Sequence, residues 1–137
     1  MVENKELGNT IIINSRIEEI GRVLEKIGAY MERKNYVGIK YKRLMGALHE
    51  AVANAVIHGN REDERKGVAV TYFDDDDQFQ IKVRDEGEGF DLSFIGDPCL
   101  PENITKSHGR GVFIIRSFVD GLSFNDKGNE ITLTIKK

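Results

Sequence analysis

The chain has 137 residues, the size of one compact domain, and leaves no room for a second core of full size. Apolar residues make up 39% and charged residues 31% of the sequence, a balance typical of soluble globular proteins and unlike that of disordered chains. The formal net charge is −3 and the basic residues are scattered, which argues against direct nucleic-acid binding through a clustered basic face.

Membrane segments, targeting signals and cysteine clusters are not predicted. No run approaches the roughly 18 consecutive apolar residues that cross a bilayer. The opening segment MVENKELGNT lacks the apolar core of a signal peptide. Cys99 is the one cysteine, so an internal disulfide and a Cys/His metal cluster are both excluded. We therefore expect a cytoplasmic protein.

The first predicted elements are a strand and a helix. Residues 10–14 contain three consecutive isoleucines, an apolar run too short for a helix and typical of a strand. Ser15 followed by Glu18 fits a capping box, and apolar residues recur at helical spacing over residues 17–31. A first helix is therefore predicted to run to about residue 34, with its apolar stripe in the core.

A second helix is predicted over residues 39–57 and ends at the segment His58-Gly59-Asn60. Its apolar face consists of Leu44, Leu48, Ala51, Val52 and Ala55. Strands are predicted at residues 67–73 and 78–85. The four aspartates at 74–77 could bind a metal, but adjacent carboxylates without a returning ligand are more typical of a solvated hairpin turn, and we predict the turn.

The last part of the chain predicts a binding loop, a third helix and a hairpin. Residues 86–108 contain several glycines, both prolines and little periodicity, which is typical of a lid. A helix is predicted over residues 111–119, and strands at 122–124 and 130–135 flank a hairpin turn at 126–129. The order β-α-α-β-β-lid-α-β-β predicts an α+β fold, a two-layer sandwich with a mixed, mostly antiparallel sheet and helices on one face.

The first group of residues that could carry chemistry lies on the second predicted helix. Glu50, Asn54 and His58 are spaced four apart, so they share one side of the helix, and small alanines between them allow another group to approach. An Asn oxygen is a suitable ligand for Mg²⁺, and a nearby carboxylate can orient or deprotonate an attacking hydroxyl. For each residue taken alone, the alternative is the polar outer face of a helix.

The second motif ends a predicted strand. Asp85 is followed by Gly87 and Gly89, which free the backbone to turn sharply and let a flat ligand lie close. Asp85 could accept a hydrogen bond from an exocyclic amine, which would select adenine over guanine. An ordinary acidic turn is the alternative.

The third motif, His108-Gly109-Arg110-Gly111, leads directly into the third predicted helix. Glycines that open a helix expose its first amides to an anion, and Arg110 could add a charged contact. A flexible lid hinge is the alternative. The P-loop, HExxH and GxSxG motifs do not occur in the sequence, so their chemistries have no support.

Together and in this order, the three motifs resemble the N, G1 and G2 boxes of the Bergerat-fold (GHKL) ATPases. Within that superfamily the chain is similar to the bacterial anti-sigma-factor serine/threonine kinases. The likeness covers essentially the whole chain and is strongest over residues 48–120, through HEAVANAVIHGN, VRDEGEGFD and HGRGVFIIRSFVD. It implies that residues 1–137 form a single histidine-kinase-like ATPase domain with the Bergerat ATP-binding fold.

The resemblance implies roles for individual residues, with ATP and Mg²⁺ as cofactors. Glu50 would be the catalytic general base or water-orienting carboxylate, and Asn54 would coordinate Mg²⁺. Asp85 would bind the adenine amino group, with Gly87 and Gly89 beside the base.

The resemblance also implies how the phosphates would be held. Gly109, Arg110 and Gly111 would face them, and residues 91–108 would form the ATP lid. His58 either lines the nucleotide site or only ends its helix.

Two departures from the family pattern bear on these contacts. Ser107 stands where the family often has a basic residue, and Lys106 or Arg110 could supply that phosphate contact instead. Asn129-Glu130 stands where the family usually has a small hydroxyl residue that makes a secondary adenine contact.

The resemblance implies an ATP-dependent serine/threonine kinase that acts as an anti-sigma regulatory factor. It would phosphorylate a small anti-anti-sigma protein of the STAS type and release a sigma factor, and a homodimer would fit the family. The alternative is an ATP-binding module that sequesters a partner without phosphoryl transfer. We expect neither a detached histidine-kinase domain nor a gyrase-like ATPase, because the length leaves no space for a phosphoacceptor hairpin or a transducer domain. No direct contact with nucleic acid or membrane is expected.

Overall fold

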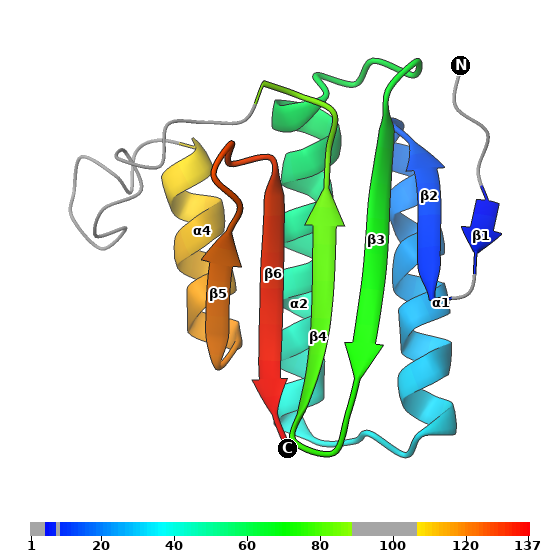
Figure 1. Cartoon of the computed structure of the whole chain (residues 1–137), viewed down its shortest axis with the longest axis vertical. Coiled ribbons are helices and arrows are strands. Elements are labelled where there is room, and N and C mark those ends of the chain that lie inside the picture. Colours follow the sequence, from blue (N-terminus) through cyan, green and yellow to red (C-terminus); the bar gives the residue numbers. More distant parts are fainter. Residues whose placement is uncertain (1–4, 8, 89–106) are drawn as a thin grey trace.

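The computed structural model describes residues 5–7, 9–88 and 107–137 (Figure 1). Its strands are β1 (Lys5–Leu7), β2 (Thr10–Asn14), β3 (Gly67–Asp74), β4 (Gln78–Arg84), β5 (Gly121–Phe124) and β6 (Glu130–Lys136). Its helices are the 3₁₀ turn η1 (Ile17–Glu19), α1 (Ile20–Arg33), α2 (Ile39–Asn54), the π-helical turn η2 (Ala55–Gly59) and α4 (Ser107–Phe118). Strand β1 is an addition to the elements predicted from the sequence.

The six strands form one sheet in the order β1-β2-β3-β4-β6-β5, and every neighbouring pair is antiparallel. Helices α1, α2 and α4 cover one face of the sheet (Figure 1). This arrangement confirms the predicted α+β two-layer sandwich. The prediction of a mixed sheet is wrong for the described strands. The hairpins β3–β4 and β5–β6 impose antiparallel pairing, and β6 also pairs with β4 in the antiparallel direction.

The core lies between the sheet and the helices. In β4 and β6, buried residues alternate with half-exposed ones, so each strand presents one apolar face to the helices. The buried strand residues are Ile11, Ile13, Val68, Val70, Phe79, Ile81, Val83, Ile131, Leu133 and Ile135. They form one cluster with helix residues that include Ile20, Val23, Ile27, Leu44, Leu48 and Val52. Full burial of each large apolar side chain contributes roughly 1.5–3 kcal/mol.

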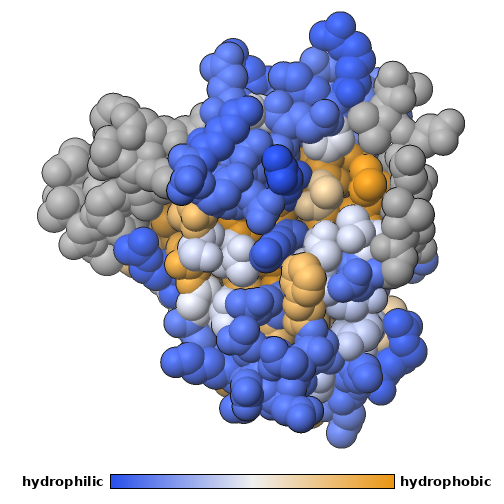
Figure 2. All heavy atoms as spheres, in the orientation of Figure 1, coloured by the Kyte–Doolittle hydropathy of each residue, from blue (hydrophilic) through white to orange (hydrophobic). Residues whose placement is uncertain are grey.

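The opposite face of the sheet is mostly hydrophilic (Figure 2). Its side chains bond to each other across strands, as the hydroxyls of Thr10 and Thr71 do at 3.0 Å. On the next strands the Gln80 amide donates to the Thr134 hydroxyl at 3.1 Å. The sheet is therefore amphipathic, and its apolar face accounts for the placement of α1, α2 and α4 on the same side.

The predicted capping box at the start of the first helix is wrong. Neither η1 nor α1 has a side-chain cap. The Ser15 hydroxyl, which is buried, instead donates to the carbonyl of Lys66 at 2.7 Å and accepts from the amide of Asn60 at 2.8 Å. The spacing of Ser15 and Glu18 suggests a cap, but the Ser15 hydroxyl bonds to residues that are distant in the chain.

Helix α2 is followed by η2, in which a hydrogen bond spans five residues instead of four. The backbone amide of Asn60 donates to the carbonyl of Ala55 at 2.8 Å. The helical segment therefore continues past the predicted end at residue 57, in widened form, as far as Gly59. Single π-helical turns of this kind are frequent at functional sites. Here the turn brings Gly59 to the end of β4.

The predicted hairpin turn between β3 and β4 is confirmed. The Asp75 carboxylate accepts hydrogen bonds from the backbone amides of Asp77 at 2.8 Å and Gln78 at 2.9 Å. Among the described residues, no group of three or more His, Cys, Asp or Glu could hold a metal ion. In the part of the chain that the structure describes, no helix is both long enough and apolar enough to span a bilayer.

Candidate functional site

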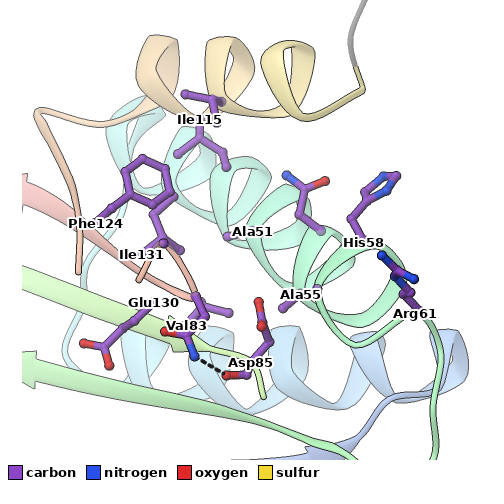
Figure 3. A pocket seen from close by; sticks show the side chains of 15 residues that line it. Ala51, Ala55, His58, Arg61, Val83, Asp85, Ile115, Phe124, Glu130 and Ile131 are labelled. Atoms are coloured by element: carbon purple, nitrogen blue, oxygen red, sulfur yellow. Dashed lines mark hydrogen bonds between the residues drawn. The ribbon is translucent and has the colours of Figure 1, made fainter. Parts of the chain in front are cut away.

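One pocket opens between α2 with η2, the ends of β4 and β6, and α4 (Figure 3). It encloses about 750 Å³, including the part that is open to solvent. Its apolar wall consists of Ala51, Ala55, Val83, Val112, Ile115, Phe124 and Ile131. Its polar side chains are Asn54, His58, Arg61, Asp85, Asn129 and Glu130. An apolar wall with a few convergent polar groups is the usual form of a small-molecule site.

The polar face of α2 and η2 is only partly in this pocket. Asn54 and His58 line it, whereas Glu50, one turn earlier and half-buried, is not among the lining residues. Ala51 and Ala55 place small side chains on the same wall, which allows a ligand to approach the helix closely. The Asn54 amide makes no hydrogen bond with another residue of the described chain, so its oxygen is available to a ligand.

Asp85 directly follows β4, and its carboxylate points into the pocket (Figure 3). Burial raises the pKa of Asp85, although the Gly87 amide, which donates to Oδ1 at 2.7 Å, acts in the opposite direction. The charges of Lys127 and Lys66 also lower this pKa, by a smaller amount. No described residue donates a hydrogen bond to Oδ2, which leaves one strong acceptor for a ligand.

Two glycines allow the Asp85 turn to lie against η2. A Cβ atom on Gly59 would stand 2.3 Å from Oδ2 of Asp85, and one on Gly87 would stand 2.2 Å from the carbonyl oxygen of Gly59. A side chain at Gly59 would displace the Asp85 carboxylate, and one at Gly87 would require the backbone of the turn or of η2 to shift. Gly87 was predicted as a site residue, but Gly59 was predicted only to end a helix. The signal for Gly59 was its position directly after the polar helix face.

The β5–β6 hairpin holds the backbone of Asp85. Asp85 donates its N–H to the carbonyl of Asn129 at 2.9 Å, and the Asn129 side-chain amide donates to the carbonyl of Asp85 at 3.1 Å. Asn125 in turn donates to Oδ1 of Asn129 at 2.7 Å. Asn129 stands where the family usually has a small hydroxyl residue. It lines the pocket and fixes the backbone of the Asp85 turn.

The third predicted motif is helical from an earlier residue than expected. Helix α4 begins at Ser107 and already includes Gly109, Arg110 and Gly111, whereas the predicted start was residue 111. Glycine's low helix propensity placed the predicted start too late. Beyond this motif, Val112 and Ile115 of α4 reach the pocket. Of the remaining predicted site residues, Gly89 and Lys106 lie outside the described residues, as does most of the expected lid.

Comparison with protein-family models matches residues 13–135 to the histidine kinase-like ATPase domain. The chain belongs to this family. The match includes every residue that lines the pocket, from Ala51 to Ile131. It therefore agrees with the resemblance that the three sequence motifs carry.

Curated relatives of this histidine kinase-like ATPase domain are named serine-protein kinase RsbW. Those of Staphylococcus aureus strains JH9, Newman and USA300 are each 36% identical to the chain over 101 residues. The matched segment covers 66% of this chain and 64% of each relative. The chain thus matches less than two thirds of the length of these relatives.

The pocket of this histidine kinase-like ATPase domain offers two kinds of polar contact. Asp85 presents a carboxylate oxygen that can accept a hydrogen bond from an amine on a flat ring. Asn54 presents an amide oxygen, a hard donor of the kind that Mg²⁺ accepts alongside phosphate oxygens and water. Both groups line one pocket with an apolar wall, and both are of the kinds that a nucleotide and its cation require.

Proposed function

We propose that the chain binds Mg-ATP in this pocket and transfers the γ-phosphoryl group to a serine or threonine of a small anti-anti-sigma protein of the STAS type. The observation that supports this most is that Asn54 and His58, from one helical segment, meet Asp85, from the end of β4, at one apolar pocket. The names of the RsbW relatives support the reaction type. Residues 1–137 would act as a single ATPase domain.

Asp85 would recognise the adenine base. Its Oδ2 would accept a hydrogen bond from the exocyclic amine, while Oδ1 stays bonded to the Gly87 amide. Guanine carries a carbonyl at the equivalent place, so two acceptors would face each other and binding would weaken. Gly87 would lie beside the base, as would Gly89, and His58 would line the same site.

The phosphate end would be formed by α2 and α4. Asn54 would hold Mg²⁺ through its amide oxygen, which fits because the side chain has no partner among the described residues. When bound, Mg²⁺ neutralises charge on the β- and γ-phosphates. Gly109 would offer its backbone amide to the phosphates with the helix dipole behind it, because in a helix that begins at Ser107 the amides of residues 107–109 have no acceptor within the helix. Arg110 would add a charged contact, and Gly111 would let the phosphates approach the helix closely. Lys106 would add a cation.

Glu50 would act as the general base for transfer. It would take the proton from the acceptor hydroxyl as that oxygen bonds to the γ-phosphorus and the bond from γ-phosphorus to the β–γ bridging oxygen breaks. ADP and a phosphorylated hydroxyl would be the products. Glu50 lies one turn before Asn54 on the same side of α2, which suits a group that contacts the acceptor and not the nucleotide.

A second candidate is a nucleotide-dependent module that sequesters a partner without transferring phosphate. It is favoured by one observation, since Glu50 is not among the residues that line the pocket. In both cases the partners would be a sigma factor and the anti-anti-sigma protein, in the cytoplasm, with a homodimer as the assembly that the family resemblance suggests.

Transfer of labelled phosphate tests the kinase proposal. The purified chain would be incubated with γ-labelled ATP, Mg²⁺ and a small anti-anti-sigma protein of the STAS type sought among the neighbouring genes, and label is expected on a serine or threonine of that protein. Glu50→Gln is expected to slow transfer by about 10²-fold or more, because the general base is lost. Glu25→Gln, exposed on α1, is the matched control and should keep the parent rate.

The outcomes separate the two candidates. Equal rates for the parent and Glu50→Gln would remove Glu50 from the mechanism. Saturable ATP binding without any labelled partner would support the sequestering module instead. A chain that binds no ATP would contradict both.

A further inference from the structure

Asn60 is a polar side chain buried close to the pocket, with 1% of its surface exposed. Its amide nitrogen donates to the Ser15 hydroxyl at 2.8 Å and to the carbonyl of Gly67 at 2.9 Å. Its amide oxygen accepts from the backbone amide of Glu86 at 2.8 Å. Both N–H groups and the oxygen are therefore engaged, and Asn60 itself does not line the pocket.

These hydrogen bonds join four segments at one end of the sheet. Ser15 follows β2, Gly67 begins β3 and Glu86 lies just beyond β4, while Asn60 itself follows η2. The Glu86 carboxylate adds a return contact, since it accepts a hydrogen bond from the backbone amide of Gly67. A buried, fully bonded amide fixes its partners strongly. If one of these hydrogen bonds broke, the buried partner would have neither the amide nor water to bond to.

The same hydrogen bonds determine how η2 and the Asp85 turn fit together. Asn60 is the neighbour of Gly59, and Glu86 is the neighbour of Asp85. The bond from Glu86 to Asn60 therefore holds the two sides of the contact in which Gly59 lies against the Asp85 carboxylate. Asn129 also holds the Asp85 backbone, but within the described part of the chain it makes no hydrogen bond to η2.

We propose that Asn60 is a positioning residue for base recognition. Through the amide of Glu86 it holds the Asp85 carboxylate against Gly59, at the place where that carboxylate selects adenine over guanine. The inference rests on the proposed function, because the ligand of Asp85 is taken to be an adenine nucleotide. Asn60 acts without touching that ligand.

Amide hydrogen exchange tests the hold on the turn without any nucleotide. In the parent the Glu86 amide should be protected, and Asn60→Ala should raise its exchange rate by about tenfold or more relative to Val70 in the core. Ser15→Ala is the matched control, since it removes a different partner of the same amide and should leave Glu86 protected. A Glu86 amide that stays equally protected in Asn60→Ala overturns the proposal.

Nucleotide preference tests the consequence for recognition. The ratio of the Kd for Mg-GTP to the Kd for Mg-ATP should fall by about tenfold in Asn60→Ala, which corresponds to about 1.4 kcal/mol. Ser15→Ala should keep the parent ratio although both variants unfold at lower temperature, because a smaller folded fraction changes both Kd values alike. An unchanged ratio in Asn60→Ala overturns the proposal.

Two further outcomes are decisive. A parent chain that binds neither nucleotide refutes the proposed function and the recognition part of this inference, while exchange at Glu86 still decides whether Asn60 holds the turn. If Asn60→Ala does not fold, Asn60→Asp keeps an oxygen toward Glu86 and should retain both protection and preference at reduced stability. Loss of both in folded Asn60→Asp contradicts the proposal.

Discussion

At the scale of single residues, the close contact between Gly59 and Asp85 requires a residue without a side chain at position 59. A Cβ on Gly59 would lie 2.3 Å from Oδ2 of Asp85, well inside van der Waals contact. In Gly59→Ala the carboxylate must move away from the place where it would meet adenine. We expect ATP affinity to fall by about tenfold or more, measured by fluorescence anisotropy with a labelled ATP.

Gly21→Ala is the control for this substitution. Gly21 lies exposed in α1, and no other group stands within 4 Å of the place that its Cβ would take. The same change there should leave affinity unaltered and add about 0.5–1 kcal/mol of stability, because alanine is the better helix former. Similar affinities for the Gly59→Ala and Gly21→Ala proteins would show that the close approach does not matter for binding.

The half-buried carboxylate of Asp85 has a predictable effect on stability without ligand. Because burial raises its pKa, the folded protein keeps this proton to higher pH than the unfolded chain, whose pKa is about 3.9. The free energy of unfolding therefore falls as pH rises from the unfolded pKa of Asp85 through its higher folded pKa. Asp85→Asn should gain in melting temperature over the parent from acidic to neutral pH, and should lose adenine binding. If the difference in melting temperature between Asp85→Asn and the parent did not change with pH, the raised pKa of Asp85 would be contradicted.

The loss of adenine binding in Asp85→Asn follows from donor and acceptor geometry. An aspartate can accept from Gly87 with one oxygen and from a ligand with the other. An asparagine has one oxygen and one NH₂ group. Its NH₂ group, a donor, must therefore face either the Gly87 amide or the amine of the ligand, which are also donors. The gain in stability and the loss of binding should therefore occur in the same protein.

At the scale of elements, a cluster around Asp74 ties α1 to the sheet at the end opposite the pocket. The Asp74 carboxylate accepts hydrogen bonds from the hydroxyls of Tyr30 at 2.6 Å and Tyr36 at 2.7 Å, and from the amine of Lys137. Burial alone would raise the pKa of Asp74, but these hydrogen bonds outweigh it and lower the pKa. The folded state therefore favours the charged form.

Asp74→Asn should destabilise the fold by about 1.5–3 kcal/mol at neutral pH, because charge-assisted hydrogen bonds are lost. Since the folded pKa is lowered, this contribution is present above the unfolded pKa of about 3.9 and disappears as pH falls through the folded value. Urea unfolding at several pH values measures it. Asp76→Asn, in the exposed hairpin, is the control and should behave like the parent. ATP affinity should not change in either protein.

The elements themselves were largely predictable from the sequence, whereas their ends were not. Alternation in β4 and helical spacing in α1 reflect burial on one face, and the structure confirms both. The end of α2 depends on a π-helical turn that lets Gly59 meet Asp85, a contact between segments far apart in the chain. The Ser15 hydroxyl likewise bonds to Asn60 and Lys66, and no local pattern reveals such partners.

At the scale of the whole molecule, the pocket exists because the antiparallel sheet brings the ends of β4 and β6 beside α2 and α4. The meeting of Asn54, His58 and Asp85 at one pocket was predictable, since each belongs to a motif. Asn60 and Asn129 were not, because they act on the backbone of the Asp85 turn and carry no motif of their own. Family membership accounts for the fold, and these local contacts fix the backbone of the Asp85 turn.

Calorimetric titration of the chain with Mg-ATP and, separately, with Mg-GTP tests nucleotide recognition most directly. We predict saturable heat for Mg-ATP at a single class of site, loss of that heat when a chelator removes Mg²⁺, and binding of Mg-GTP weaker by about tenfold or more. No heat with Mg-ATP, or equal affinity for the two nucleotides, would contradict this prediction.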